Sequence, residues 1–390
     1  MPKPASKPGS DHKTQNPEPA GLPTDWSFLA PPQKPGELGR FAHYRIFHLL
    51  GTGGMSLVFL AEDVRYHRKI ALKVLKPEFV SDEDARPRFV REAQLTAKIK
   101  HDHIITIHEV GQVGDLPFIA MEYFDGVMLA EWMEANPHPP IRTVLALAKD
   151  IASGLSAAHA NGLIHRDIKP TNIMINEATG QVKILDFGLA RAIKPDVSLT
   201  RKGFIVGTPA FMSPEQARGG QLDHRSDLFS FGILLYLMCT GKLPFHGQNP
   251  LEILTNLCTE HPKPVHERNH TVPFAMSELI ARLLGKKREQ RPSFAAEVIA
   301  SLEQIEQEMT RAEGMLEIQE NNDTLITPLP SRRTDPNLAQ ALLQAPPMLR
   351  PIAMTQTWKT RLWLYVGIPL LFALIFYGLL LFGWWLLRAS

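Results

Sequence analysis

The stretch His165-Arg-Asp-Ile-Lys-Pro-Thr-Asn172, followed fourteen residues later by Asp186-Phe-Gly188, decides the fold and the chemistry of this chain. It places two carboxylates, an amide and a lysine close together in the sequence. Carboxylate and amide oxygens are ligands that suit Mg²⁺, a cation that usually shares them with substrate phosphates. The remaining carboxylate, Asp167, can sit beside an acceptor hydroxyl. The pattern therefore indicates phosphoryl transfer, in which positioning and charge neutralisation supply most of the catalysis.

These two strings, H-R-D-x-x-x-x-N and D-F-G, resemble the catalytic and metal-binding segments of eukaryotic-like (Hanks-type) serine/threonine protein kinases, and neither carries a substitution. The resemblance implies that Asp167 accepts or orients the substrate hydroxyl. It implies that Asn172 and Asp186 bind Mg²⁺, with Mn²⁺ as an alternative. Lys169 would neutralise the transferring phosphoryl group, and it is typical of the branch that acts on serine and threonine. Arg166 would bind a phosphate on the activation segment.

A glycine-rich segment lies between two predicted strands near the start of the domain. Glycine lets the backbone approach phosphate oxygens because no Cβ intrudes. Alone this signal is weak, since most glycine-rich turns are hairpin loops. The resemblance makes it the loop that covers ATP, with Ser56 standing where the family has a third glycine. Its residues are Leu50, Gly51, Thr52, Gly53, Gly54, Met55, Ser56 and Val58.

Lys73 lies in Ile70-Ala-Leu-Lys-Val74, which is similar to the V-A-I-K strand of the family. A lysine flanked by apolar residues is costly to bury without a counter-ion. The resemblance provides the nucleotide phosphates and Glu92, which lies on a predicted helix over residues 86–100. Glu122 opens the hinge at residues 122–126, whose backbone contacts the adenine ring in the family. Glu122 is therefore included among the predicted nucleotide-binding residues.

The resemblance implies an α+β, bilobal protein kinase fold over residues 44–305, with a β-rich N-lobe (44–121) and a helical C-lobe (127–305). Apolar periodicity agrees with this division. Predicted strands span residues 44–50, 57–61, 69–75 and 118–121, and predicted helices span 129–134, 141–161, 227–240, 250–259, 277–284 and 294–308.

Four residues are expected to support the site without reacting. The family resemblance implies that Asp227 braces the catalytic loop, and its position predicts that it caps the helix beginning there. Glu215 is expected to pair with Arg291, a kind of buried pair whose halves are each costly to lose. His165 is expected to anchor the backbone rather than transfer a proton.

The activation segment, between Gly188 and Thr208, contains the candidate phosphorylation sites Ser198, Thr200 and Thr208. Our hypothesis is that the enzyme phosphorylates Thr200 or a neighbour in trans and that the phosphate orders the segment. The alternative is an unregulated loop.

Composition divides the rest of the chain. Residues 1–38 hold nine of the 32 prolines, which predicts a disordered arm. Residues 309–361 are polar and predict a juxtamembrane linker, either a docking or autophosphorylation segment or a passive tether. Residues 362–387 carry no charge and predict a transmembrane helix. Basic residues before this span favour a single-pass protein of the cell membrane with a cytoplasmic kinase domain and residues 388–390 outside.

The expected partners follow from these assignments. They are protein substrates bearing serine or threonine, the lipid bilayer, and a second copy in a homodimer. The net charge of +2 argues against nucleic acid. Two alternatives are a catalytically silent membrane scaffold and a kinase of small molecules or lipids. The retained charged residues of the site oppose the first, and the string from Gly207 to Glu215, typical of protein-substrate kinases, opposes the second.

Overall fold

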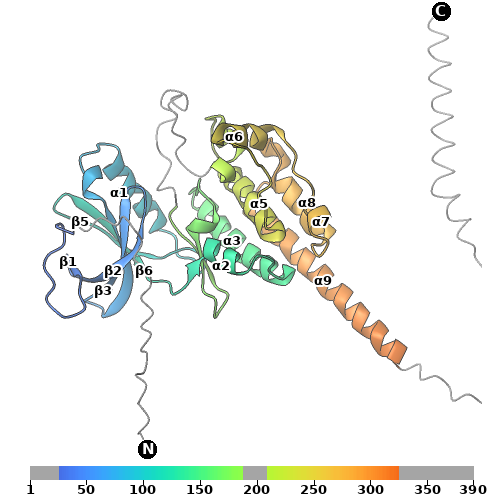
Figure 1. Ribbon diagram of the computed structural model, residues 1–390, viewed down its shortest axis with the longest axis horizontal. Helices are drawn as coiled ribbons and strands as arrows, with labels where there is room; N and C mark the ends of the chain where they lie inside the picture. Colours follow the sequence, from blue (N-terminus) through green and yellow to red (C-terminus); the bar gives the residue numbers. More distant parts are fainter. Residues whose placement is uncertain (1–25, 188–208, 325–390) are drawn as a thin grey trace, which may run out of the picture. The chain divides into compact units, whose positions relative to one another are not determined.

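A β-rich N-lobe precedes a helical C-lobe in the computed structural model, which describes residues 26–187 and 209–324 (Figure 1). Six antiparallel strands form the N-lobe sheet in the order β1-β2-β3-β4-β6-β5. Helix α1 (Ala85–Thr96) interrupts them between β4 and β5. Two of the strands, β1 and β5, have no counterpart among the predicted ones. The strands are β1 (Gly39–Phe41), β2 (Tyr44–Thr52), β3 (Ser56–Asp63), β4 (Arg68–Leu75), β5 (Ile107–Val113) and β6 (Leu116–Glu122).

The two faces of this sheet bury different residues. Side chains alternate between the faces of a strand. In β6, Phe118 and Ala120 belong to an aromatic cluster on one face, whereas Ile119 joins Phe89 and Ala93 of α1 on the other. A slip of one residue would exchange the two sets, so burial on both faces fixes the register of the sheet.

Residues 26–38 lie against the aromatic face of the sheet. The prediction that the arm is disordered was therefore wrong for these residues. Trp26 packs edge-on against Phe59 with ring centroids 5.3 Å apart, and Phe28 contacts the same ring at 6.3 Å. Ala30 pairs with β1 through an antiparallel bridge. The high proline content suggested disorder, but composition does not reveal that the rings of Trp26 and Phe28 pack on the N-lobe sheet. We call residues 26–38 the N-terminal strap; residues 1–25 lie outside the described part of the chain.

Within its described residues, the C-lobe consists of helices and one small antiparallel sheet. Helix α6 begins and ends at the predicted residues, whereas α5 and α8 each begin three residues earlier than predicted. The strands are β7 (Val127–Met128), β8 (Ile173–Ile175) and β9 (Val182–Ile184). The helices are α2 (Leu129–Ala135), α3 (Ile141–Ala160), α4 (Pro214–Ala217), α5 (His224–Thr240), α6 (Pro250–Thr259), α7 (Val265–Arg268), α8 (Phe274–Leu283) and α9 (Ala295–Thr324).

Helix α5 forms the centre of the C-lobe core. Thirteen of its 17 residues are buried, as expected for a helix that is apolar nearly all round. Gly232 permits the close approach of α8, because a Cβ at this position would lie 2.7 Å from Leu283 Cβ. Helix α5 therefore provides a rigid base for the residues at its start, which contact the catalytic loop.

Helix α9 continues beyond the predicted end of the domain. The prediction placed a linker from residue 309, but the helix runs to Thr324. Lys149 of α3 pairs with Glu306 at 2.7 Å, and Arg142 of α3 pairs with Glu313. These pairs hold the extended helix against α3, so the first part of the predicted linker is helical.

The predicted transmembrane helix, residues 362–387, lies outside the described part of the chain, as do residues 325–361 and 388–390. Within residues 26–187 and 209–324, no helix combines the length and the apolar character needed to cross a bilayer. The bilobal fold is confirmed, and the transmembrane helix stays a prediction.

Candidate active site

Three predicted residues converge in the loop between α3 and β8. The Asp167 carboxylate accepts a hydrogen bond from Asn172 Nδ2 at 2.9 Å and pairs with Lys169 Nζ at 2.7 Å. Asn172 Nδ2 also donates to the Asp167 carbonyl oxygen at 2.7 Å. Because both bonds use the nitrogen of this amide, its oxygen remains available for a cation. The loop thus brings together the three side chains for which the resemblance implies acceptor, phosphoryl and metal roles.

A buried carboxylate on α5 holds this loop in place. Asp227 is 1% exposed and accepts bonds from the backbone N–H of His165 at 2.8 Å and of Arg166 at 2.7 Å. It also lies 2.8 Å from His159 Nε2. Arg166 has a φ of +67°, a left-handed conformation that costs energy in a residue with a side chain. The bonds to Asp227 maintain this conformation directly before Asp167.

The prediction that Asp227 caps its helix was wrong. Helix α5 begins at His224, and its N-cap is Asp223, whose side chain accepts the Arg225 N–H. Asp227 lies within the first turn, where its carboxylate points to the catalytic loop. The bracing role implied by the resemblance agrees with these contacts.

His165 links the catalytic loop to the segment that carries Asp186. Its ring is buried, with Nε2 at 2.7 Å from the Leu185 carbonyl oxygen and Nδ1 at 3.2 Å from the Asp167 N–H. A neutral imidazole with its proton on Nε2 satisfies both contacts. His165 therefore anchors the backbone, as expected.

Lys73 pairs with Asp186 rather than with the predicted helix glutamate. Lys73 is 5% exposed, and its Nζ lies 2.5 Å from Asp186 Oδ1. Glu92 is half-buried on α1, and its Oε2 has no hydrogen-bond partner among the residues that the structure describes. Asp186 already supplies the counter-ion that a buried ammonium requires. The predicted pair of Lys73 with Glu92 is therefore not formed here.

Burial changes the protonation of Glu92. It raises the pKa of this carboxyl from 4.5 to about 7, although the positive charges of Arg166, Arg88 and Lys73 oppose the rise. Arg166 Nε is also buried without a hydrogen-bond partner in the described part of the chain. Among the described residues, a buried polar atom without a partner therefore lies on each side of the site, on α1 of the N-lobe and in the catalytic loop of the C-lobe.

The glycine-rich segment forms the hairpin between β2 and β3. The Gly53 N–H donates to the Ser56 carbonyl oxygen at 2.8 Å, which closes the turn. Ser56 is buried, so this departure from the family pattern fills space below the turn. The register of β3 and β4 places Val58 opposite Lys73. The other predicted residues of this loop lie in the same hairpin: Leu50, Gly51 and Thr52 in β2, and Gly54 and Met55 in the turn.

The Glu122 side chain is engaged in structural contacts, and the nucleotide contact that the resemblance assigns to the backbone of the hinge stays a prediction. Its Oε1 accepts the Thr106 N–H and a bond from Lys183 Nζ, both at 2.7 Å. Its own N–H donates to the Thr106 carbonyl oxygen at 2.9 Å. A contact from Glu122 to a nucleotide would therefore use its backbone carbonyl.

The predicted pair of Glu215 and Arg291 is confirmed. Two guanidinium nitrogens meet the two carboxylate oxygens at 2.7 and 2.8 Å, and Ser226 donates to the carboxylate at 2.7 Å. Burial tends to raise the pKa of Glu215, but the bonds from Arg291 and Ser226 outweigh it and lower that pKa. This pair joins α4, after the activation segment, to the loop that precedes α9.

Three residues that support the site were not predicted. His159 bonds Asp227, Lys183 bonds Glu122, and Gln216 Nε2 donates to the Arg166 carbonyl oxygen at 2.8 Å. His159 and Lys183 occupy apolar, periodic segments of the sequence. A titratable residue in such a segment needs a partner when it is buried, and this was the signal that could have found them.

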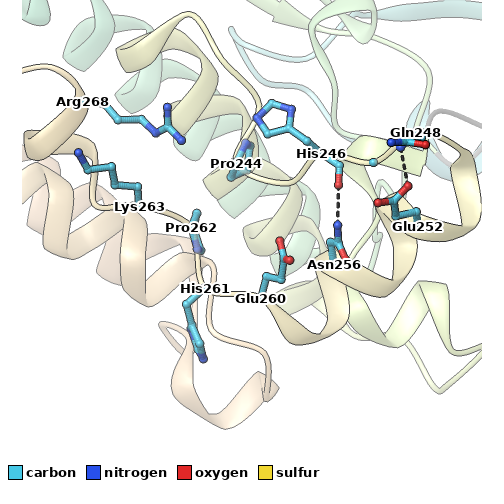
Figure 2. A pocket seen from close by; sticks show the side chains of 11 residues that line it. Pro244, His246, Gln248, Glu252, Asn256, Glu260, His261, Pro262, Lys263 and Arg268 are labelled. Carbon is cyan, nitrogen blue, oxygen red and sulfur yellow. Dashed lines mark hydrogen bonds between the residues drawn. The ribbon is translucent and has the colours of Figure 1, made fainter.

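A hollow of about 550 Å³ in the C-lobe lies apart from these residues (Figure 2). Its lining comes from the loop after α5, from α6 and from the connection to α7. Asn256 Nδ2 donates to the His246 carbonyl oxygen at 2.7 Å, and Glu252 accepts the Gln248 N–H at 2.6 Å. None of its lining residues belongs to the predicted site, so the hollow is not part of the candidate active site.

The donor set fits Mg²⁺ held jointly with a nucleotide. Within residues 26–187 and 209–324, no three His, Cys, Asp or Glu side chains gather closely enough to hold a metal ion. Asn172 and Asp186 would supply two oxygen ligands, and Mg²⁺ usually takes one or two protein carboxylates together with substrate phosphates.

Comparison with known proteins places this arrangement in a family. The sequence pattern described as the protein kinase domain matches residues 44–302. Serine/threonine-protein kinase PknB of Mycobacterium leprae is 40% identical over 263 residues, which cover 66% of this chain and 42% of that protein. Serine/threonine-protein kinase pkn3 of Myxococcus xanthus is 38% identical over 298 residues, which cover 74% of this chain and 54% of that protein. This chain thus spans about half the length of these relatives.

A solved structure shows the same likeness. The kinase domain of Mycobacterium tuberculosis PknI matches with a TM-score of 0.54 and 25% identity, covering 68% of this chain and 97% of that one. The matched sequence region contains the catalytic loop, the glycine-rich hairpin and Lys73. This chain belongs to the protein kinase domain family.

Proposed function

We propose that this chain is an ATP-dependent serine/threonine protein kinase that uses Mg²⁺. The observation that carries the proposal is the connection between two pairs of charged residues. Asp167 with Lys169 forms one pair, and Lys73 with Asp186 forms the other. The bond from His165 to the Leu185 carbonyl oxygen joins the segments that carry them. Acceptor, phosphoryl and metal functions therefore lie on one braced framework.

Each residue has a definite part in the reaction. Asp167 accepts or orients the hydroxyl of the substrate, and Lys169, already 2.7 Å from that carboxylate, neutralises charge on the phosphoryl group. Lys73 supplies an ammonium for the nucleotide phosphates, and Asp186 and Asn172 supply oxygens for Mg²⁺. When bound, Mg²⁺ would neutralise phosphate charge and hold the phosphates in position.

Two observations support serine and threonine as acceptors. Lys169 follows Asp167 in the pattern D-x-K-P-x-N, which resembles that branch of the family. The relatives named above carry the description serine/threonine-protein kinase.

The test is phosphate incorporation by the full chain, purified in detergent, with Mg²⁺ and ATP. We expect transfer to serine or threonine of a general protein substrate, and its loss in both Asp167→Asn and Lys73→Met. Phosphate transfer to a small molecule alone would contradict the proposal. Tight ATP binding without any phosphate transfer would also contradict it and would favour a membrane scaffold.

Membrane anchoring through residues 362–387 is the second part of the proposal. An uncharged stretch of 26 residues, with aromatic residues near both of its ends and basic residues before it, supports it. We expect the full chain to remain with membranes after extraction at alkaline pH. Release of the intact chain into the supernatant would contradict this part.

Autophosphorylation of the activation segment is the third part. Arg166, whose Nε is buried without a bond to any described residue, supports it because guanidinium groups bind phosphate well. The candidate acceptors Ser198, Thr200 and Thr208 lie outside the described residues. Active enzyme mixed with Asp167→Asn protein should phosphorylate the variant, which mass spectrometry would detect. Absence of phosphate between residues 189 and 209 in an active preparation would contradict this part.

A further inference from the structure

A buried lysine on β9 forms an ion pair that the proposed reaction does not use. The Lys183 side chain is 8% exposed, and its Nζ lies 2.7 Å from Glu122 Oε1 and 3.5 Å from the Ile104 carbonyl oxygen. A buried ion pair is weak support for stability, because apolar residues of similar size often serve as well or better. The other two residues of β9 are buried and apolar. Lys183 therefore requires an explanation other than packing.

The partner of Lys183 stands where the chain leaves the N-lobe. Glu122 is the last residue of β6, and residues 123–126 carry the chain to β7 of the C-lobe. Within the described part of the chain, the backbone groups of Tyr123 and Phe124 make no hydrogen bond. They are available to a ligand at this crossing segment, defined here as residues 122–124.

The crossing segment lies at the end of the nucleotide site away from the phosphates. Strands β4 and β6 pair with Lys73 opposite Ile119 and Ile70 opposite Glu122. Three strand residues, roughly 10 Å, therefore separate Lys73 from the level of Glu122. A nucleotide with its phosphates at Lys73 can reach the crossing segment with its base.

The strand of Lys183 also leads to the phosphate end of the site. Asp186 follows Lys183 by three residues, and the Leu185 N–H between them bonds the Asn172 carbonyl oxygen at 2.9 Å. Lys183 thus ties the crossing segment to the strand that positions both candidate metal ligands.

We propose that Lys183 is a positioning residue which, through Glu122, fixes the crossing segment against the adenine base. The inference rests on the proposed function, because it assumes a nucleotide between the lobes. Without the ammonium, Glu122 Oε1 keeps only its bond from Thr106, and the crossing segment can shift. Affinity for the base then falls, while the residues that act on the phosphoryl group keep their places.

The experiment compares Lys183→Met, Lys183→Arg and Glu122→Gln in the full chain, purified in detergent. The matched control is Lys149→Met, since Lys149 also forms an ion pair of 2.7 Å but joins α3 to α9. Calorimetry gives the affinity for adenosine and for ADP with Mg²⁺. Steady-state kinetics give KM for ATP and kcat, and thermal unfolding gives Tm.

We expect Lys183→Met to weaken adenosine and ADP binding by the same factor, about 10- to 100-fold, the scale of a misplaced positioning residue. KM for ATP should rise by a similar factor, with kcat nearly unchanged, because binding common to ground and transition states is lost. Lys183→Arg should restore most of the affinity, and Glu122→Gln should behave like Lys183→Met. Lys149→Met should bind as wild type.

Each other outcome has a definite meaning. A lower Tm with wild-type affinity for adenosine in Lys183→Met would make the pair purely structural and overturn the proposal. If that variant does not fold, unchanged adenosine affinity in Glu122→Gln overturns it instead. A wild-type chain that binds adenosine but transfers no phosphate would contradict the proposed function, while the affinities would still decide the role of Lys183. A wild-type chain that binds no nucleotide would overturn both.

Discussion

The C-lobe and N-lobe sides of the active site differ in how completely their carboxylates are paired. On the C-lobe side, Asp227 bonds the backbone before Asp167, and Asp167 in turn bonds Asn172 and Lys169. On the N-lobe side, Glu92 Oε2 is buried without a partner among the described residues. The fold therefore fixes the acceptor side through a buried helix. It leaves Lys73 with two alternative counter-ions, Asp186 and Glu92.

The largest effect should follow from breaking the acceptor side at its reactive carboxylate. Asp167→Asn keeps an oxygen near Asn172 but removes the charge that orients the substrate hydroxyl. We expect the transfer rate at saturating ATP to fall by about 10²- to 10⁴-fold, with Tm nearly unchanged. The control is Asp115→Asn, an exposed carboxylate near Arg86. A variant that retains most of the wild-type rate would contradict the role of Asp167.

A smaller effect on the transfer rate is expected at Asp227, the carboxylate that holds the catalytic loop. Asp227→Asn cannot accept from all three donors, because one carboxylate oxygen becomes an NH₂ group. We expect kcat to fall about 10- to 100-fold through misplacement of the loop. We also expect the free energy of unfolding to fall by about 3–5 kcal/mol, as when a buried pair is broken. Steady-state kinetics and urea unfolding measure the two effects.

Helix α5 also provides the control for Asp227. Asp223 is its true N-cap, so Asp223→Asn should change the free energy of unfolding by no more than about 1 kcal/mol and leave kcat nearly unchanged. Equal losses of kcat in the two variants would show that helix stability, not bracing, is what the loop requires.

The pH dependence of stability sharpens the N-lobe side of the comparison. The pKa of Glu92 is raised from 4.5 to about 7, so the folded chain binds a proton there that the unfolded chain releases. The stabilising contribution of Glu92 is complete below pH 4.5 and is lost as pH rises through about 7. Glu92→Gln has no such loss and should become more stable relative to wild type across this range.

Thermal unfolding of both proteins against pH measures this difference. If Glu92 replaces Asp186 as the counter-ion of Lys73 during turnover, the variant should also transfer phosphate about tenfold more slowly. A Tm difference that is independent of pH would contradict the buried, unpaired state of Glu92.

The smallest effect on activity is expected at the N-terminal strap, which is not part of the candidate active site. Trp26→Ala removes a ring from the aromatic face and should lower the free energy of unfolding by about 1–3 kcal/mol without a loss of kcat. Tyr66→Ala is the control, since Tyr66 is an exposed aromatic residue that is 67% accessible. Equal stability of the two variants would show that the strap does not contribute to the N-lobe.

Sequence reasoning was strongest where one local string carries the chemistry. The residues from His165 to Asn172 could be identified because phosphoryl transfer requires those types at that spacing. Helices such as α3 and α5 could be placed because their apolar pattern is long. The pair of Glu215 and Arg291 came from the family resemblance.

The misses have a common physical cause. The partner of Lys73 depends on where α1 and Asp186 lie, which no local pattern encodes. Asp227 looked like a cap because the polar residues before it hid the true start of α5 at His224. The continuation of α9 depends on ion pairs with α3, about 160 residues earlier in the chain. Such tertiary contacts override local propensity.

The N-terminal strap has a practical consequence for dissecting this protein. The family match begins at residue 44, yet Arg45 of β2 bonds Glu37 at 2.7 Å, and the buried ring of Phe59 is covered by Trp26. A fragment cut at residue 44 would leave Arg45 with Glu62 as its remaining partner and would expose an aromatic face to solvent, which favours aggregation. The autonomous folding unit therefore starts at or before residue 26, and a protease cut or a fusion junction between residues 26 and 44 should compromise it.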